Sequence, residues 1–261
     1  MTFSIDQYRL DGKVAVVTGA GGRGNSIGRA YALGLAGAGA AVVVADLNGE
    51  GAARVAAEIK DAGGMGISAQ VDITDPQAVQ AMAKAAADAF GGVDILVNNA
   101  ALMIELSNQL VVDTPLEEWN RLMAVNVTGA INCVQALVPQ MRARGGGKIV
   151  NQLSGGAFPA QSLYGVSKLA LLGLTTTLAR QLGRDKINVN AIAPGNVMSD
   201  AGKLLTPDDS PFIKLLEATV AMRVRGQPDE LVGPLLLLCS AAGDWITGQT
   251  LHVDGGWVLR P

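Results

Sequence analysis

The feature that most constrains this chain is a glycine-dense turn between two short apolar runs near its start. Residues 13–18 and 41–46 are rich in β-branched side chains with almost no polar interruption, which is typical of strands covered on both faces. Residues 19–28 follow the first run and contain five glycines, and an Ala- and Leu-rich helix then extends to about Ala38. A strand, a helix and a second buried strand predict the start of a parallel α/β sheet.

The same alternation continues to the end of the chain. We predict further helices at about 48–62, 76–90, 115–144 (with a break near Asn126), 164–183 and 229–241, and further strands at about 66–71, 93–97, 148–153, 187–192 and 249–253. Seven strands alternating with helices predict one doubly wound parallel sheet of the Rossmann type, with helices on both faces. No linker or change in composition divides the chain, so we expect residues 1–261 to form a single domain, with an inserted segment at about 197–224 that we call the lid.

Composition argues against several classes of protein. Charged residues make up 16% of the chain and the net charge is −3, so nothing indicates a surface for nucleic acid or a strongly anionic membrane. Residues 1–12 lack the apolar core of a signal peptide, and the longest apolar run, 231–242, is too short to span a bilayer. We therefore expect a cytoplasmic protein that acts on a small molecule and binds neither nucleic acid nor membrane.

The chain has a single histidine, His252, and this limits its hydrolytic and metal chemistry. A Ser-His-Asp hydrolase or a multi-histidine zinc site would have to be built around that residue. It lies in an alternating, strand-like stretch, so we interpret it as structural and expect no metal site. Cys133 and Cys239 lie in apolar surroundings without a C-x-x-C pairing, which favours buried free thiols.

The glycine turn and the acid that ends the second strand predict a dinucleotide site. Glycines let the backbone approach a pyrophosphate, whose charge lies at the N-terminus of the following helix. Asp46 would accept hydrogen bonds from the adenosine ribose and repel a 2′-phosphate, and Leu47 offers no compensating cation. We therefore predict NAD rather than NADP, although Arg23 in the turn argues the other way. The alternative is a glycine-rich loop that binds no ligand.

Several other residues lie at the predicted carboxyl ends of strands. Besides Asp46, these are Asp72, Asn98, Ser154 and Pro194. In open parallel sheets, ligands bind beyond the carboxyl ends of the strands. We therefore expect these residues to line one crevice.

Tyr164 and Lys168 are four residues apart on a predicted helix and therefore share a face. An ammonium beside a phenol favours the phenolate and lowers the pKa of the tyrosine from about 10. A hydroxyl from Ser154 could hold an alcohol or carbonyl oxygen beside that phenol, which suits proton transfer. Taken alone, this spacing also occurs on ordinary solvated helix faces, so the interpretation depends on the rest of the chain.

A series of short motifs resembles one known family over essentially the whole chain. In order they are Thr18–Gly19, Asp46, Asp72–Ile73, Asn98–Asn99–Ala100, Val125–Asn126–Val127, Ser154, Tyr164-x-x-x-Lys168, Pro194–Gly195, Ile246–Thr247–Gly248 and Val253–Asp254–Gly255–Gly256. Each motif is common, but together they are specific. The chain resembles the short-chain dehydrogenase/reductase family, of the compact NAD(P)-dependent type.

This resemblance implies a catalytic tetrad of Asn126, Ser154, Tyr164 and Lys168. Tyr164 would be the general acid/base and Ser154 would orient the substrate oxygen. Lys168 would lower the pKa of the tyrosine and hold the nicotinamide ribose, and Asn126 would anchor a water in a proton relay. Homotetramers are common in the family. The expected cofactor-binding residues are Gly19, Arg23, Ser26, Ile27, Gly28, Asp46, Leu47, Asp72, Ile73, Asn99, Ala100, Ala101, Tyr164, Lys168, Pro194, Gly195, Val197 and Ser199.

Two lengths depart from the usual family pattern. The phosphate turn from Thr18 to Gly28 is three residues longer, and Ser26 takes the place of its middle glycine, where its hydroxyl could donate to the pyrophosphate. A serine there resembles the enoyl-reductase branch, which usually spaces its Tyr and Lys more widely than this chain does. The connection from Ser154 to Tyr164 is ten residues rather than thirteen, so Ser162 is a second, poorer candidate for the catalytic serine.

We therefore expect an NAD-dependent enzyme that interconverts a secondary alcohol and a ketone by hydride transfer. The lid contains the apolar residues Leu204, Leu205, Phe212, Ile213, Leu215, Leu216 and Met222, and Leu102, Met103 and Phe158 could add to an apolar pocket wall. Such a wall suits an apolar, cyclic substrate. Packing of the lid against the rest of the domain explains the same residues equally well. The alternatives are a 3-oxoacyl-thioester reductase using NADPH and a non-catalytic nucleotide-binding regulatory protein.

Overall fold

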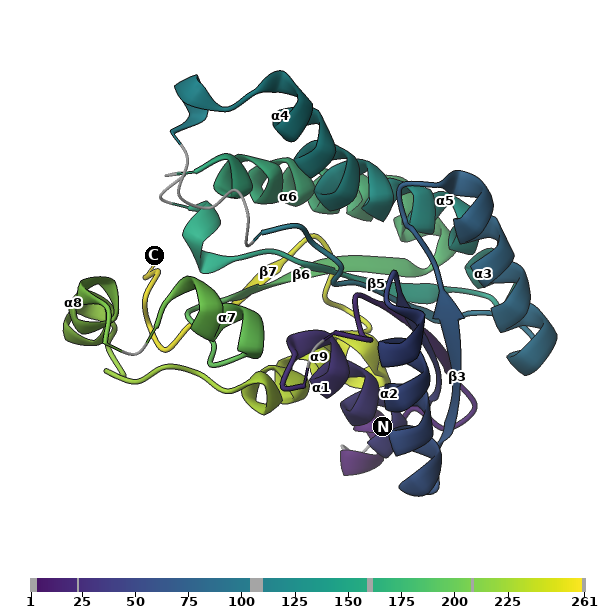
Figure 1. The fold of residues 1–261 in the computed structure, drawn as a ribbon. Helices are drawn as coiled ribbons and strands as arrows, with labels where there is room; N and C mark the ends of the chain where they lie inside the picture. The colour runs from purple at the N-terminus through teal and green to yellow at the C-terminus, as the bar shows by residue number, and fades with distance from the viewer. Residues whose placement is uncertain (1–3, 23, 104–109, 159–161, 208, 260–261) are drawn as a thin grey trace.

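The computed structural model describes residues 4–22, 24–103, 110–158, 162–207 and 209–259. Its centre is a seven-stranded sheet in the order β3-β2-β1-β4-β5-β6-β7, with every neighbouring pair parallel (Figure 1). The doubly wound fold predicted from the sequence is thereby confirmed. The strands are β1 Val14–Thr18, β2 Ala41–Asp46, β3 Met65–Gln70, β4 Ile95–Asn98, β5 Gly147–Gln152, β6 Ile187–Pro194 and β7 Thr250–Val253.

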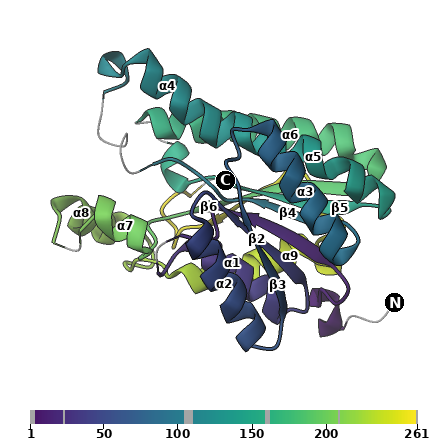
Figure 2. The same cartoon turned by 45° about the vertical axis from the view of Figure 1, so that its right-hand side comes forward.

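Helices cover both faces of this sheet (Figures 1 and 2). Alternate strand residues divide between two cores: Val16 and Val43 join one apolar cluster, and Val17 and Val44 join the other. The strands are continuous apolar runs because both of their faces are buried. One face carries α1 Ile27–Gly37, α2 Gly49–Asp61 and α9 Val232–Cys239, and the other carries α3 Pro76–Phe90, α5 Gly129–Ala143 and α6 Leu163–Leu182.

The long helix predicted over residues 115–144 is interrupted as expected. It consists of α4 Leu116–Met123, a π-helical turn Ala124–Thr128 and α5, so the break falls at Asn126. A π-turn inserts an extra residue into the helical repeat and often marks a functional position. Local capping residues mark both ends of α3. Asp75 is the N-cap, and the helix ends at Phe90 before the C-cap Gly91, whose φ of 81° suits glycine.

The segment Leu116–Ala143 is also long and apolar enough, by length and composition alone, to cross a membrane. In this structure Cys133, Leu137 and Met141 from its second half are fully buried in the core against the sheet. That packing accounts for its apolar character. Cys133 and Cys239 are both buried and free, as predicted.

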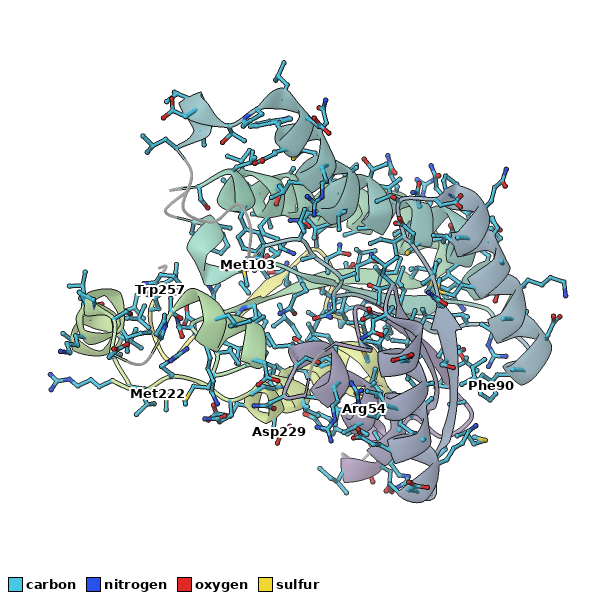
Figure 3. The ribbon with its side chains drawn as sticks, viewed as in Figure 1. Arg54, Phe90, Met103, Met222, Asp229 and Trp257 are labelled. Carbon is cyan, nitrogen blue, oxygen red and sulfur yellow. The ribbon has the colours of Figure 1, made fainter. Side chains whose placement is uncertain are left out.

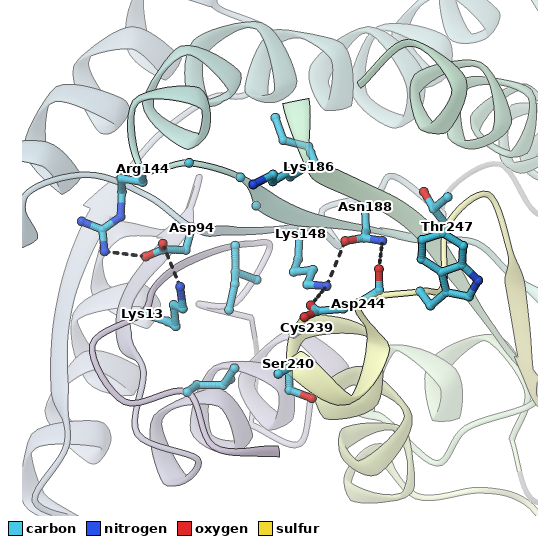
Figure 4. A pocket seen from close by; sticks show the side chains of 18 of the residues that line it. Lys13, Asp94, Arg144, Lys148, Lys186, Asn188, Cys239, Ser240, Asp244 and Thr247 are labelled. Carbon is cyan, nitrogen blue, oxygen red and sulfur yellow. Dashed lines mark hydrogen bonds and ion pairs between the residues drawn. The ribbon is translucent and has the colours of Figure 1, made fainter. Parts of the chain in front are cut away.

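A cavity of about 630 Å³ opens at the amino ends of the strands, at the edge opposite the predicted crevice (Figure 4). Several of its charged groups are paired with one another. Asp94 accepts hydrogen bonds at 2.9 Å from the backbone N–H of Val14 and pairs at 2.9 Å with Arg144, while Lys148 pairs at 2.7 Å with Asp244. These contacts hold the starts of β1 and β5 against the end of α5 and the turn that contains Asp244.

Candidate active site

Ser154 and Tyr164 are positioned by the end of β5 and the start of α6. Ser154 follows the strand and caps the short 3₁₀ turn Gly155–Ala157, where its Oγ accepts a hydrogen bond from the N–H of Gly156 at 3.1 Å. Ser162 instead caps α6 and accepts the N–H of Gly165 at 3.2 Å. Since the Ser154 hydroxyl interacts with the Tyr164 phenol, Ser154 is the serine that can share a substrate oxygen with the tyrosine.

Tyr164 is half-buried and packs against Leu122 and Leu163. Burial raises the pKa of Tyr164, and the Ser154 hydroxyl acts in the opposite direction. We predicted that Lys168 would hold this pKa low, and for the ligand-free protein that prediction is wrong. The physical reason is that removing the phenolate from water outweighs the neighbouring groups.

Lys168 is itself fully buried, with 1% of its surface exposed. Its Nζ donates to the main-chain carbonyl of Gln152 at 2.8 Å and lies 5.4 Å from the centre of the Tyr164 ring. Burial lowers the pKa of Lys168 to about 7, so the residue carries only part of its charge near neutrality.

Asn126 connects the loop after β4 to the catalytic helix. Its Oδ1 accepts the N–H of Leu102 at 2.8 Å, and its Nδ2 donates to the carbonyl of Leu102 at 3.1 Å and to Ser167 Oγ at 3.0 Å. Ser167 in turn donates to the main-chain carbonyl of Tyr164 at 2.7 Å. Asn126 therefore positions the catalytic helix, and its contact with a relay water stays a prediction.

The glycine turn packs directly on the end of β4. Gly19 has a φ of 66°, and a Cβ there would lie 2.7 Å from the Cα of Ala100. A Cβ on Gly28 would overlap the carbonyl oxygen of Gly19 and lie 2.6 Å from the side-chain amide of Asn99. Asn99 donates to the carbonyls of Thr18 and Gly19 at 2.9 and 3.1 Å. Only glycine fits this close packing at either position.

The N-terminus of α1 points its free N–H groups at the same turn. Ser26 is the N-cap, and its Oγ accepts the N–H of Arg29 at 3.2 Å, so its own proton is still available to a ligand oxygen. Ile27 and Gly28 open the helix, and their N–H groups add to the positive end of its dipole. Arg23 lies outside the described residues.

Asp46 ends β2, as predicted, and already carries two backbone contacts. Its Oδ2 accepts the N–H of Gly21 at 2.9 Å and its Oδ1 accepts the N–H of Asn48 at 2.9 Å. Leu47 beside it is 67% exposed. The carboxylate thus joins the glycine turn to the start of α2 and presents its remaining lone pairs to solvent.

The other predicted cofactor residues lie at or after the carboxyl ends of β3, β4 and β6. Asp72 is exposed and accepts hydrogen bonds from Thr74, whereas Ile73 is buried and its carbonyl accepts from Asn132. Ala101 is exposed at the end of β4. On the opposite side, Pro194 ends β6, Gly195 packs on Asp254, Val197 forms a bridge with Gly226, and Ser199 caps α7 Asp200–Leu205.

These residues fit a dinucleotide. The turn between Gly19 and Gly28 is a cradle that a Cβ would fill, the α1 N-terminus supplies free N–H groups, and Asp46 can accept from hydroxyls. Over the described ranges, no group of three or more His, Cys, Asp or Glu residues is arranged to hold a metal ion.

Comparisons with known proteins agree with this geometry. A family model described as Enoyl-(Acyl carrier protein) reductase matches residues 22–258. An uncharacterized oxidoreductase of Mycobacterium tuberculosis (strain ATCC 25618 / H37Rv) is 47% identical over 251 residues, covering 96% of this chain and 99% of that protein. The chain belongs to the short-chain dehydrogenase/reductase family. It is an NAD(P)-dependent oxidoreductase that acts on an alcohol or the corresponding ketone.

Two solved structures of this family are close to the whole chain. One is a 7α-hydroxysteroid dehydrogenase complexed with NADH and 7-oxo glycochenodeoxycholic acid, with a TM-score of 0.89, 36% identity and 99% coverage of both chains. The other is a gluconate 5-dehydrogenase from Burkholderia cenocepacia J2315 in complex with NADP and tartrate, with a TM-score of 0.89, 37% identity and 97% coverage of both chains. The family therefore includes both nicotinamide cofactors and both steroid and polyhydroxy ligands.

The lid, residues 197–224, has both buried and exposed apolar side chains. It contains α7 and α8 Pro211–Thr219, which project to one side of the sheet (Figure 1). Ile213 and Leu216 are buried, whereas Leu204, Leu215 and Met222 are 60%, 62% and 66% exposed. Part of the predicted apolar set is therefore buried under the lid, and part is exposed to solvent. The side chains of Leu205 and Phe212 lie outside the described part of the structure.

Sequence reasoning missed a contact between the glycine turn and this lid. The N–H of Asn25 donates to Asp200 Oδ2 at 3.0 Å, and the N–H of Asp200 donates to the carbonyl of Asn25 at 3.0 Å. The Asn25 side chain also donates to the carbonyl of Met198 at 3.1 Å. The only signal in the sequence was the extra length of the turn, which does not identify a partner 175 residues away.

It also missed the residues around Gln152. The Gln152 carbonyl holds Lys168, while its side-chain oxygen accepts from the buried Tyr31 hydroxyl at 2.8 Å. His252 was interpreted as structural, and its ring packs against Phe158 with 4.6 Å between ring centres. These contacts cross between elements, and no sequence spacing indicates them.

Proposed function

We propose that this protein is an NAD-dependent dehydrogenase that interconverts a secondary alcohol and its ketone, with Tyr164 as the general acid/base. The observation that carries the proposal is the meeting of the Ser154 hydroxyl and the Tyr164 phenol, over buried Lys168, at the same sheet edge as the glycine cradle. This arrangement provides one position where a single oxygen can accept from Ser154 and exchange a proton with Tyr164.

The nicotinamide cofactor supplies or accepts the hydride. Ser154 holds the substrate oxygen, and its rotamer is fixed by the N–H of Gly156. Tyr164 donates its proton to the forming alcohol in reduction and receives the alcohol proton in oxidation. Since burial favours the protonated phenol, oxidation needs a protonated Lys168 beside it to lower the pKa of Tyr164.

The preference for NAD rests on Asp46. A carboxylate at the end of β2 repels a 2′-phosphate, and the neighbouring Leu47 is apolar. We expect NAD(H) to be used with a much higher kcat/KM than NADP(H), and Asp46→Ala to narrow the difference. Higher efficiency with NADPH in the unmodified protein would contradict this part of the proposal.

The substrate that we propose is an apolar, cyclic secondary alcohol or ketone. The exposed apolar residues of the lid support it, as does the similarity to a structure that contains a 7-oxo bile acid. We further propose that the physiological direction is oxidation and that the protein is a cytoplasmic homotetramer that binds neither membrane nor nucleic acid.

A 3-oxoacyl-thioester reductase using NADPH is the second candidate, because the matching family model carries an acyl-carrier name. Reduction of an enoyl double bond is less favoured, since Tyr164 and Lys168 are four residues apart. The two candidates differ in one measurement. Acetoacetyl thioesters should be reduced faster with NADPH if the second is correct, whereas cyclic ketones should be reduced faster with NADH if the first is correct.

The decisive experiment compares the wild type with Tyr164→Phe on a panel of secondary alcohols and ketones, followed by NADH absorbance. Losing a positioned acid/base group should lower kcat by about 10²- to 10⁴-fold while NADH binding is retained. Unchanged turnover in Tyr164→Phe would show that the mechanism is wrong. NADH binding without turnover of any compound in the wild type would favour the non-catalytic regulatory protein.

A further inference from the structure

The short connection after Ser154 is covered by a residue from the far end of the chain. A Cβ on Gly155 would lie 3.0 Å from Cε3 of Trp257 and 3.1 Å from the carbonyl oxygen of Pro194, and a Cβ on Gly156 would lie 3.7 Å from Cη2 of the same indole. The turn is therefore held between the indole and the end of β6. Trp257 lies at the end of the molecule that carries α7 and α8 (Figure 3).

The main chain that carries the indole is fixed by hydrogen bonds to Asp254. The Asp254 carboxylate accepts the N–H groups of Gly256 at 2.9 Å, Trp257 at 3.3 Å and Val258 at 2.9 Å. That carboxylate side chain is only 4% exposed, so its bonds are shielded from water. Gly255 also accepts the N–H of Met222 at 2.9 Å, which joins this tail to the end of the lid. Trp257 therefore lies in a turn whose main chain is ordered by several hydrogen bonds.

The contact leads directly to the catalytic serine. Gly156 supplies the N–H that fixes Ser154 Oγ, and Gly155 and Gly156 have no side chains to fill the space around them. If the indole were removed, the turn would lose one of its two walls. Its N–H would then hold the hydroxyl less firmly, and a misplacement of about 1 Å in such a group can cost two orders of magnitude in rate.

We propose that Trp257 positions Ser154 and forms the substrate wall that the three missing residues of the Ser154–Tyr164 connection would otherwise supply. This inference rests on the proposed function and deepens it. Trp257 is half-buried, and the proposal places the exposed part of this residue against a ligand held at Ser154. A flat apolar face next to the substrate oxygen suits a secondary alcohol on a ring, because a ring presents a broad apolar surface to it.

The chain offers a matched control for this residue. Trp245 is 99% exposed and lines the cavity at the amino ends of the strands, away from the proposed site. The experiment measures kcat, KM, NADH affinity and thermal midpoint for Trp257→Ala, Trp257→Phe and Trp245→Ala. Each is assayed with a cyclic secondary alcohol, such as cyclohexanol, and an open-chain one, such as 2-propanol.

We expect Trp257→Ala to lower kcat/KM for the cyclic alcohol by about 10- to 100-fold, with a smaller loss for the open-chain alcohol. NADH affinity should stay within about twofold, because the indole lies on the serine side of the site. Trp257→Phe should recover most of the loss, and Trp245→Ala should match the wild type. An equal loss on both alcohols together with a lowered thermal midpoint would indicate a purely structural role and overturn the proposal.

A second measurement covers the case in which Trp257→Ala does not fold. In a Trp119→Phe/Trp245→Phe background, Trp257 is the single tryptophan of the chain. Saturation with the ketone product should change its emission, and the change should vanish when Trp257→Phe is added. An unchanged emission would overturn the substrate wall. If the Trp257 variants show normal kinetics while Tyr164→Phe is inactive, this inference alone is overturned. If Tyr164→Phe is active, the proposed function is overturned.

Discussion

The glycine turn and the serine connection depart from the family pattern in opposite directions, and the chain compensates for them by different chemistry. The turn from Thr18 to Gly28 is three residues longer than usual and is fastened by polar contacts between Asn25 and Asp200. The connection after Ser154 is three residues shorter and is covered by the indole of Trp257.

The difference has a simple physical origin. Added residues bring N–H and C=O groups that need partners, and a carboxylate with a neighbouring N–H satisfies both. Missing residues instead leave surface uncovered, and a large apolar ring fills that space. In both cases the partner comes from the C-terminal third of the chain, so the lid and tail adjust the two halves of the site.

The largest expected effect is a difference in kcat between variants of the two serines, Ser154 and Ser162. Ser154→Ala should lower kcat by about 10²- to 10³-fold, because it removes a donor aimed at the substrate oxygen. Ser162→Ala should leave kcat near the wild type and lower the free energy of unfolding by about 1 kcal/mol, since it removes a helix cap. Steady-state kinetics and urea unfolding of both variants test the assignment, and a reversed pattern would make Ser162 the catalytic serine.

A smaller loss is expected when the short connection is crowded. Gly155→Ala places a methyl group 3.0 Å from the indole, so the turn must shift and kcat should fall by about 10-fold. The defect should be smaller in Gly155→Ala/Trp257→Phe than in Gly155→Ala, because the smaller ring leaves room. Gly173→Ala on α6 has nothing within 4 Å of the new Cβ and is the control. Additive effects of the Gly155 and Trp257 substitutions would contradict direct contact.

The long turn should respond more weakly. Asp200→Ala removes the partner of the Asn25 N–H and should weaken NADH binding by about 2- to 10-fold, the usual worth of one hydrogen bond. Asp200→Asn keeps an acceptor oxygen and should bind NADH almost as the wild type does. Fluorescence titration with NADH measures both, and equal affinities for the wild type and Asp200→Ala would show that the turn orders itself without the lid.

The serine side also contains the buried ammonium of Lys168, whose pKa burial lowers to about 7 from about 10.4 in an unfolded chain. The unfolded chain therefore binds more protons between these values, and this residue makes stability rise with pH across that window. Below pH 7 the buried charge of Lys168 lowers the free energy of unfolding, and Lys168→Met removes this charge. The free energy of unfolding of Lys168→Met should exceed that of the wild type most at pH 6, and the excess should shrink by pH 9. An excess that does not change with pH would contradict the lowered pKa.

Much of the architecture could be predicted because its signals are local. Short apolar runs located the seven strands, the helix predicted over residues 76–90 matches α3, and the break near Asn126 falls within the observed π-turn. The strand-end residues could be assigned to one edge of the sheet because parallel strands end at the same edge. The pKa of Tyr164 could not be predicted correctly, since it depends on how much water the folded site excludes.

The sequence by itself determined the family, the doubly wound sheet and the identity of Asn126, Ser154, Tyr164 and Lys168 as candidates, because periodicity and short spacings are properties of the chain alone. Only the tertiary structure decided that Lys168 is held by the carbonyl of Gln152 and that Asp200 and Trp257 complete the two altered loops. Those contacts join residues far apart in the chain, and they exist because the sheet brings the carboxyl ends of its strands to one edge.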